Sequence, residues 1–196
     1  LILTLLPIRA FAMSAEEIVR NSQAAFLYQG NDFKARVTMR LLSGSGSERI
    51  REMTMLRKNY GQSGDNQKYF IYFFRPSDVK DMTFMVYKYP KKDSDRWLFV
   101  PALNMVRRIA AQDKHSSFVG SDFTYEDISG RDVDEDTHSI VREEKLGTAD
   151  CYVVKSIPKA GDMDYGYKLS WMDKKRFLPL KEEYYDKNGA LYKVFT

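Results

Sequence analysis

The sequence is poor in the residues that build cross-links and metal centres. Its one cysteine, Cys151, cannot form an internal disulfide, and its two histidines, His115 and His138, have no Cys or His neighbours at metal-ligand spacing. Cys151 is followed by Tyr152-Val-Val154, which predicts a buried strand thiol rather than a nucleophile. We therefore predict no metal and no cofactor.

Long basic runs and long apolar runs are also missing. The densest basic stretch is Lys174-Lys-Arg176, and the net charge is only +4 from 31 basic and 27 acidic residues. Proteins that bind nucleic acid usually carry a basic stripe or a recognisable motif, so we predict no nucleic-acid partner. After residue 12 no stretch approaches the ~20 apolar residues that a membrane-spanning helix needs.

Aromatic residues, in contrast, are abundant. They make up 14% of the 196 residues and are mainly Tyr and Phe, which favour strands. With 43% apolar and 30% charged residues, the composition is that of a folded soluble protein. We expect residues 13–196 to form one monomeric domain, whose last strand, Leu191 to Thr196, is cut off at the end of the chain.

The first twelve residues predict export. Leu1 to Ile8 is apolar, and Ala10-Phe-Ala12 has the small-x-small pattern of a signal-peptidase site. An initiator Met and a basic region are missing before it, so the chain is expected to be truncated at its start. We interpret residues 1–12 as the remnant of a secretion signal, cleaved after Ala12, and predict a periplasmic mature protein.

One helix and then a series of strands follow. Ser14 and Glu17 form a capping box, and Gly30 is a plausible helix stop. One helical face should hold Ala15, Ile18, Val19, Ser22, Ala25 and Phe26. From Asp32 onward the apolar residues alternate with period two, which predicts about ten consecutive antiparallel strands. Asn188-Gly189 predicts a type I′ hairpin turn. The fold class is thus mainly β (α+β), a single antiparallel meander curved into an open or closed barrel.

The stretch from Asp95 to Ile128 is predicted to form a hairpin followed by a segment that covers the sheet. Trp97 to Val100 and Met105 to Ala110 predict a hairpin that turns at Pro101 to Asn104. The polar residues from Gln112 to Asp127, called here the lid segment, cannot form a core alone. Three spaced aromatics suit this segment to lie across an apolar surface and cover it: Phe118, Phe123 and Tyr125.

These features carry a family resemblance. Trp-Leu-Phe-Val-Pro at 97–101, Val-Arg-Arg-Ile at 106–109 and Phe-Val-Gly-Ser-Asp-Phe-Thr-Tyr-Glu-Asp at 118–127 resemble the outer-membrane lipoprotein-sorting proteins, which are LolA-like. The resemblance implies a half-open antiparallel barrel over residues 13–196. Its concave apolar face would be covered by the N-terminal helix and the lid segment, and its cavity would receive acyl chains. It also implies a carrier-type Arg after an early strand, for which Arg57 is the candidate.

The residues themselves also favour an apolar cavity. A curved sheet of this length has an inner face too large for one helix to fill, and strand Lys68 to Arg75 is apolar on both faces. Which of its faces points inward stays open at this level. The predicted lining residues, alternatively plain core residues, are Phe70, Tyr72, Phe74, Met85, Trp97, Phe99, Tyr167, Leu169 and Trp171.

The predicted function is that of a non-enzymatic periplasmic carrier, which binds acyl chains of lipoproteins or lipids for sorting to the outer membrane. A membrane donor or acceptor protein would be its partner. An alternative is a lipid-sensing regulatory domain with the same fold. A periplasmic hydrolase is a second alternative, since Ser116 and Ser117 adjoin His115. Asp132 to Glu143 imitates a calcium loop, but Thr137 stands where that loop requires Gly.

Overall fold

The computed structural model describes residues 13–61, 65–161 and 163–196. The predicted signal remnant, 1–12, and its cleavage site lie outside the described residues. The chain divides into two compact units, which are treated separately below. The first-sheet unit comprises Leu27–Glu135 and Ala160–Asp164, and the second-sheet unit comprises Asp136–Lys159, Tyr165–Thr196 and the N-terminal residues up to Phe26.

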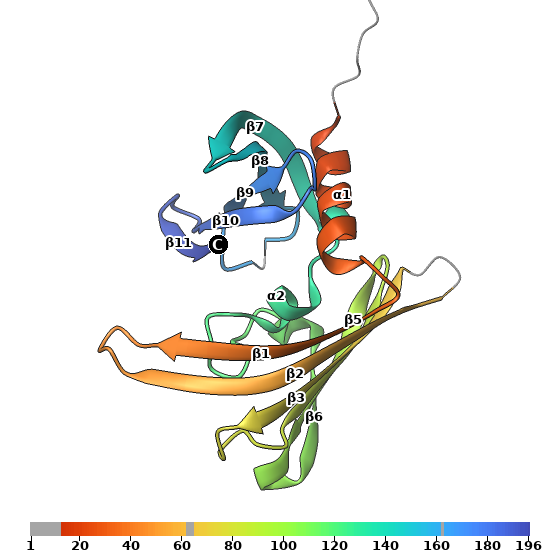
Figure 1. The fold of residues 1–196 in the computed structure, drawn as a ribbon, viewed down its shortest axis with the longest axis vertical. Coiled ribbons are helices and arrows are strands. Elements are labelled where there is room, and N and C mark those ends of the chain that lie inside the picture. The colour runs from red at the N-terminus through yellow and green to blue at the C-terminus, as the bar shows by residue number, and fades with distance from the viewer. Residues whose placement is uncertain (1–12, 62–64, 162) are drawn as a thin grey trace, which may run out of the picture. The chain divides into compact units, whose positions relative to one another are not determined.

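The first-sheet unit is built on a six-stranded antiparallel meander (Figure 1). Its strands pair in chain order, each with the next. They are β1 (Asp32–Leu42), β2 (Glu48–Tyr60), β3 (Asn66–Arg75), β4 (Thr83–Tyr89), β5 (Lys92–Val100) and β6 (Met105–Ile109). After β6 come two short 3-10 helices and a short α-helix: η2 (Ala111–Asp113), α2 (Tyr125–Ser129) and η3 (Val133–Glu135). The lid segment therefore lies between the two sheets in the sequence.

The two faces of this sheet differ in burial. Residues directly opposite each other in an antiparallel pair point to the same face of the sheet. The register therefore tells on which face each paired side chain lies. One face, called here the covered face, is buried at Tyr69, Ile71 and Phe73 of β3 and at Phe84 and Val86 of β4. The alternate residues, Phe70 and Met85 among them, form the opposite face. The structure thereby shows which face of β3, a strand that is apolar on both faces, is covered.

The second-sheet unit holds a five-stranded antiparallel meander and helix α1 (Ala15–Leu27). The strands are β7 (Asp136–Leu146), β8 (Ala149–Pro158), β9 (Tyr167–Asp173), β10 (Pro179–Tyr185) and β11 (Leu191–Phe195). Cys151 of β8 is fully buried beside Val153 and Trp171, as expected for a structural thiol. Both sheets are open, and the predicted antiparallel fold with an N-terminal helix is confirmed, although the meander is divided into two sheets after β6.

Helix α1 begins where the capping box predicts. The Glu17 backbone N–H donates to Ser14 Oγ at 3.2 Å, and the Ser14 N–H donates to Glu17 Oε2 at 2.8 Å. Ile18, Val19 and Ser22 are buried, but Phe26, predicted on the same face, is 61% exposed. The prediction for Phe26 is wrong because the helix ends one residue later, at Leu27, where the chain turns away toward β1.

The Asn188-Gly189 turn also differs from its prediction. Gly189 has a φ of 84°, but Asn188 is not among the described residues with positive φ, as a type I′ turn would require. The Asp186 carboxylate accepts from the backbone N–H groups of Asn188 and Ala190, both at 2.8 Å. This side-chain acceptor favours a wider, Asp-initiated loop that still closes the β10–β11 hairpin. Among the described residues no helix is both long and apolar enough to cross a membrane.

Candidate functional site

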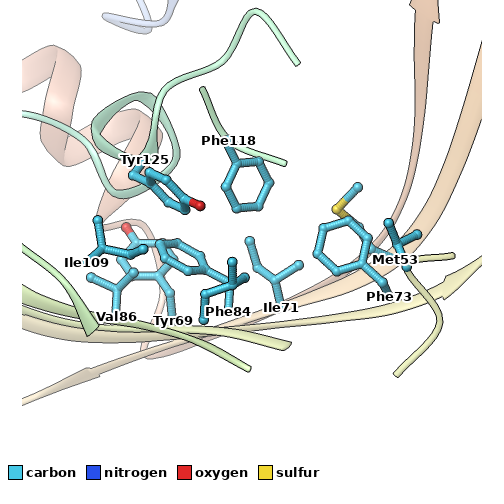
Figure 2. Close-up of a cluster of buried hydrophobic side chains, with 11 residues drawn as sticks. Met53, Tyr69, Ile71, Phe73, Phe84, Val86, Ile109, Phe118 and Tyr125 are labelled. Carbon is cyan, nitrogen blue, oxygen red and sulfur yellow. The ribbon is translucent and has the colours of Figure 1, made fainter. Parts of the chain in front are cut away.

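The lid segment lies on the covered face and buries two aromatic rings against it. Phe118 is 0% exposed and Tyr125 is 7% exposed. The Phe118 ring centroid lies 5.2 Å from that of Phe84 and 6.1 Å from that of Phe73, and 5.6 Å from that of Tyr125. Figure 2 shows both lid rings pointing down onto the side chains of the sheet. Phe118 and Tyr125 of the lid segment thus pack on an apolar face of the first sheet.

The lid segment holds itself in shape with a small hairpin. A bridge joins Ser117 to Thr124, and the Phe118 N–H donates to the Phe123 carbonyl oxygen at 2.6 Å. The chain reverses at Val119 and Gly120, with φ values of 52° and 70°. A β-branched residue rarely adopts such a φ, so Val119 is strained. The buried Arg51 of β2 donates through Nη1 to the Val119 carbonyl and holds this turn against the sheet.

The third predicted lid aromatic behaves differently from the other two. Phe123 is 37% exposed. The next residue, Thr124, begins α2 with a complete capping box: the Asp127 N–H donates to Thr124 Oγ1 at 3.0 Å, and the Thr124 N–H donates to Asp127 Oδ2 at 2.7 Å. Phe118 and Tyr125 are thus the buried aromatic residues of the lid segment.

A charge network around the buried Glu126 ties the two ends of the lid segment together. Lys114 Nζ lies 3.0 Å from Glu126 Oε1 and 3.2 Å from Glu135 Oε2. Arg131 Nη1 lies 3.3 Å from Glu126 Oε2 and 2.9 Å from Glu135 Oε2. Burial alone would lower the pKa of Lys114, but the two carboxylates outweigh it and raise that pKa. The network matches charges of opposite sign, so it holds α2 in place despite its burial.

One end of the covered face is polar. The register places Arg57, Tyr69, Val86 and Arg96 in one row across β2 to β5. Lys88 is also buried and is 3.7 Å from Asp132 Oδ1 and 3.3 Å from the Gly130 carbonyl oxygen. Burial lowers the pKa of Lys88, and the Asp132 carboxylate only partly offsets this effect. The covered face thus changes from aromatic at Phe73 and Phe84 to cationic at this end.

Arg57, the predicted carrier-type Arg, is one of these buried cations. Its guanidinium donates to the carbonyl oxygens of Leu27 and Gln29, just where α1 ends. Gln67 Nε2 donates to the same Leu27 carbonyl at 2.7 Å, and Tyr69 Oη donates to Gln67 Oε1 at 2.8 Å. Arg57 therefore fixes Leu27 and Gln29 at the start of the chain that leads into β1.

Comparison with known proteins identifies the family of this chain. A family model described only as an uncharacterized protein matches residues 65–196. The crystal structure of a DUF1329 family protein from Desulfovibrio piger is 30% identical, with a TM-score of 0.83, and the alignment covers 92% of this chain and 75% of that one. A putative outer membrane lipoprotein-sorting protein domain from Vibrio parahaemolyticus is 31% identical, with a TM-score of 0.82 and the same coverages, 92% and 75%. This chain belongs to the outer-membrane lipoprotein-sorting protein family.

The fold of this lipoprotein-sorting family member is LolA-like. A LolA superfamily protein from Nitrosomonas europaea is only 20% identical, but its structure has a TM-score of 0.63 over 93% of this chain and 76% of that one, which supports the shared fold. Both the 30% and the 31% identical relatives align across both units of this chain. Comparison with curated proteins gives no match.

Six of the predicted lining residues lie on the opposite face of the first sheet, away from the lid segment. In register, Phe70 stands beside Met85 and Met85 beside Trp97, while Tyr72 stands in the row of Phe99. Phe70 and Phe74 are 40% and 36% exposed. The structure thus brings the lining candidates of β3 to β5 together, but the lid rings of this family member cover the other side. Their role as lining residues stays a prediction.

The other three lining candidates belong to β9 in the second-sheet unit. Tyr167 stacks on Tyr185 of β10, with ring centroids 4.7 Å apart. Trp171 is 4% exposed, packs in the small core around Cys151, and donates through Nε1 to Glu144. Leu169 packs against the same core. Trp171 is therefore a well-packed core residue of its own sheet, and the role of all three as lining residues also stays a prediction.

The serine hydroxyls of the hydrolase alternative donate to backbone carbonyl oxygens, and its histidine lies near a carboxylate. The Ser116 hydroxyl donates to the Asp113 carbonyl oxygen and the Ser117 hydroxyl to that of Ser121, both at 2.6 Å. His115 Nδ1 lies 3.6 Å from Glu126 Oε2, at the edge of the charge network. Among the described residues no group of three or more His, Cys, Asp or Glu side chains is placed to hold a metal ion.

Sequence reasoning missed the buried Lys88, Arg96 and Glu126. Lys88 has the same strand parity as the buried Phe84 and Val86, and Arg96 has that of Leu98. This alternation in phase with buried residues was the sequence signal that could have predicted the burial of Lys88 and Arg96. The charge on these side chains concealed it, because a lysine or arginine in an alternating strand normally marks the solvent face.

Proposed function

We propose that this protein is a non-enzymatic periplasmic carrier that binds acyl chains of lipoproteins or lipids for sorting to the outer membrane. The observation that carries the proposal is the position of Phe118 and Tyr125. Two aromatic rings, one from the lid hairpin and one from the first residue of α2, occupy an apolar sheet face that extends through Ile71, Phe73 and Phe84. A surface covered by removable side chains can accept an acyl chain in their place.

The energetics are compatible with such an exchange. Removing a buried Phe from its packing costs about 3–5 kcal/mol, and each buried methylene returns about 0.8 kcal/mol. Four to six methylenes, as an order of magnitude, would offset the undocking of Phe118. Longer acyl chains would then bind with a net gain, whereas short carboxylic acids would leave the lid segment closed.

The lid segment is also held by contacts that can be released together. The Lys114–Glu126–Arg131 network and the Arg51 contact to Val119 secure it by polar interactions, and strain at Val119 favours its release. Membership in the lipoprotein-sorting family supports a carrier and export to the periplasm. The predicted cleavage after Ala12 belongs to the same proposal. A sensor domain with the same site would bind the same chains, so the experiment below addresses the site itself.

The test is photo-crosslinking of delipidated protein with a diazirine-bearing palmitate, followed by peptide mapping. The labelled residue of β4 identifies the face that binds the acyl chain, because Phe84 and Met85 are adjacent residues on opposite faces of the sheet. We expect saturable labelling at Phe84, Ile71 or Phe118, competed by unlabelled palmitate. Labelling at Met85, Phe70 or Trp97 would place the chain on the opposite face and refute the role of the lid segment. Absence of saturable labelling would refute the carrier proposal, and release of a cleaved lipid product would favour the hydrolase alternative.

A further inference from the structure

The hairpin between β5 and β6 exposes an apolar tip. Leu103 is 67% exposed, Val106 is 63% exposed and Met105 is 44% exposed, so three large apolar side chains within four residues face solvent. The chain turns there through a short 3-10 helix, η1 (Pro101–Leu103), and through Asn104, whose N–H donates to the Pro101 carbonyl oxygen at 2.9 Å. Figure 1 shows β6, in green, at one end of the first sheet, where it is the edge strand next to β5. Because the turn has a regular hydrogen bond, the three apolar side chains are exposed by an ordered part of the fold.

Two arginines follow the apolar tip directly. The side chains of Arg107 and Arg108 are 61% and 69% exposed. From Trp97 to Gln112 the sequence has no Asp or Glu. Arg107 Nη2 is 4.0 Å from Asp113 Oδ2, and Arg108 pairs with Asp95, farther along β5. Exposed pairs of this kind contribute about 0–1 kcal/mol, so both guanidinium groups can exchange these partners for another anion.

We propose that the β5–β6 tip docks onto the surface of an anionic phospholipid bilayer. Leu103, Met105 and Val106 enter the boundary between headgroups and acyl chains, and the Arg107 and Arg108 guanidinium groups bind lipid phosphates. A protein partner would need a standard interface of about 800 Å² on each side, far more than three side chains supply. A bilayer needs only a few apolar side chains and adjacent cations. Binding through so small a tip is reversible.

The position of the tip separates this proposal from the acyl site. Leu103 and Asn104 lie in the turn, beyond the rows of the covered face that Phe118 and Tyr125 occupy. In register Val106 stands beside Phe99 and Arg108 beside Trp97, so the Val106 and Arg108 side chains lie on the opposite face of the sheet and not on the covered face. Docking therefore requires neither lid opening nor a bound acyl chain, and it can fail while the carrier proposal holds.

Vesicle cosedimentation of the full chain tests the proposal. Phosphatidylcholine vesicles with and without phosphatidylglycerol are compared for the wild type, Leu103→Ser and the double variant Arg107→Gln/Arg108→Gln. We expect binding only to the anionic vesicles. The serine variant should lose about tenfold in partitioning, since a buried leucine is worth roughly that factor. Each arginine removed should lose about fivefold.

Matched controls come from the β1–β2 hairpin. Leu42 is 70% exposed and the Arg40 side chain is 65% exposed, so Leu42→Ser and Arg40→Gln reproduce the chemical changes elsewhere and should bind like the wild type. A solvent-sensitive dye attached to Leu103→Cys should shift to the blue with anionic vesicles, and the same dye on Leu42→Cys should not. The reactive thiol is unique, because Cys151 is buried.

Four results would overturn the proposal. They are equal binding to neutral and anionic vesicles, unchanged binding of the tip variants, equal losses in the controls, and no binding to either vesicle type. The last result would exclude a phospholipid bilayer as the partner of the tip.

Discussion

Substitution of Phe118 by Ala is the perturbation that best separates a removable cover from a fixed core. Phe118 is fully buried and belongs to a hairpin of its own, outside the strands of the sheet. Truncating such a ring costs about 3–5 kcal/mol in a core. If the lid segment opens as a local unit, this cost falls on its closing equilibrium and leaves the unfolding of the sheet nearly unchanged.

The expected size of the effect follows from that assignment. A loss of about 3 kcal/mol raises the open population by more than about 100-fold, up to the point where the lid segment is mostly open. The affinity for an apolar probe or a fatty acid should rise by the same factor, because the competing ring is gone. The amide of Phe118, bonded to the Phe123 carbonyl in the closed form, should exchange its hydrogen correspondingly faster.

Phe73→Ala is the matched control. Phe73 has the same 0% exposure and lies 6.1 Å from Phe118 between ring centroids, but it belongs to strand β3. This variant should lower the midpoint of global unfolding and should not raise probe affinity. The reasoning is refuted if Phe118→Ala lowers the global midpoint as much as Phe73→Ala does, with unchanged affinity per folded molecule.

Further outcomes are expected from chain length, the charge network and acid. Fatty acids shorter than about six carbons should not compete with a bound probe, whereas decanoate and palmitate should, as a displacement titration would reveal. Glu126→Gln should speed hydrogen exchange of residues 112–127, because the half-buried Lys114 loses the nearer of its two carboxylate partners, at 3.0 Å, at a cost of about 1–3 kcal/mol; unchanged exchange would contradict this role. Burial would raise the pKa of Glu182, but Lys168 at 2.9 Å and other donors hold that pKa below its usual 4.5. Its contribution to stability should therefore be present above pH 4.5 and vanish as the pH falls through the lowered pKa, and unfolding midpoints of Glu182→Gln should lack that acid-dependent loss.

The sequence by itself determined the features that depend on neighbours along the chain. The α1 capping box joins residues three apart, Ser14 and Glu17, and it forms as predicted. Strand alternation, the turns between strands and the buried thiol of Cys151 likewise follow from local pattern. The motifs at 97–101 and 118–127 led to the lipoprotein-sorting family, which the relatives confirm. Local signals fail where a competing side chain is close by, as Asp186 alters the turn at Asn188-Gly189.

Only the tertiary structure decided which face of the doubly apolar strand is covered. Tyr69, Ile71 and Phe73 have no intrinsic advantage over Phe70, Tyr72 and Phe74, since both sets are large and apolar. The decision comes from Phe118, more than forty residues later in the chain, whose ring lies against Phe73 and Phe84. The burial of Arg57 and Lys88 was equally hidden, because a cation can leave solvent only when distant carbonyl or carboxylate oxygens meet it. For Arg57 those oxygens belong to Leu27 and Gln29, and no local pattern brings them together.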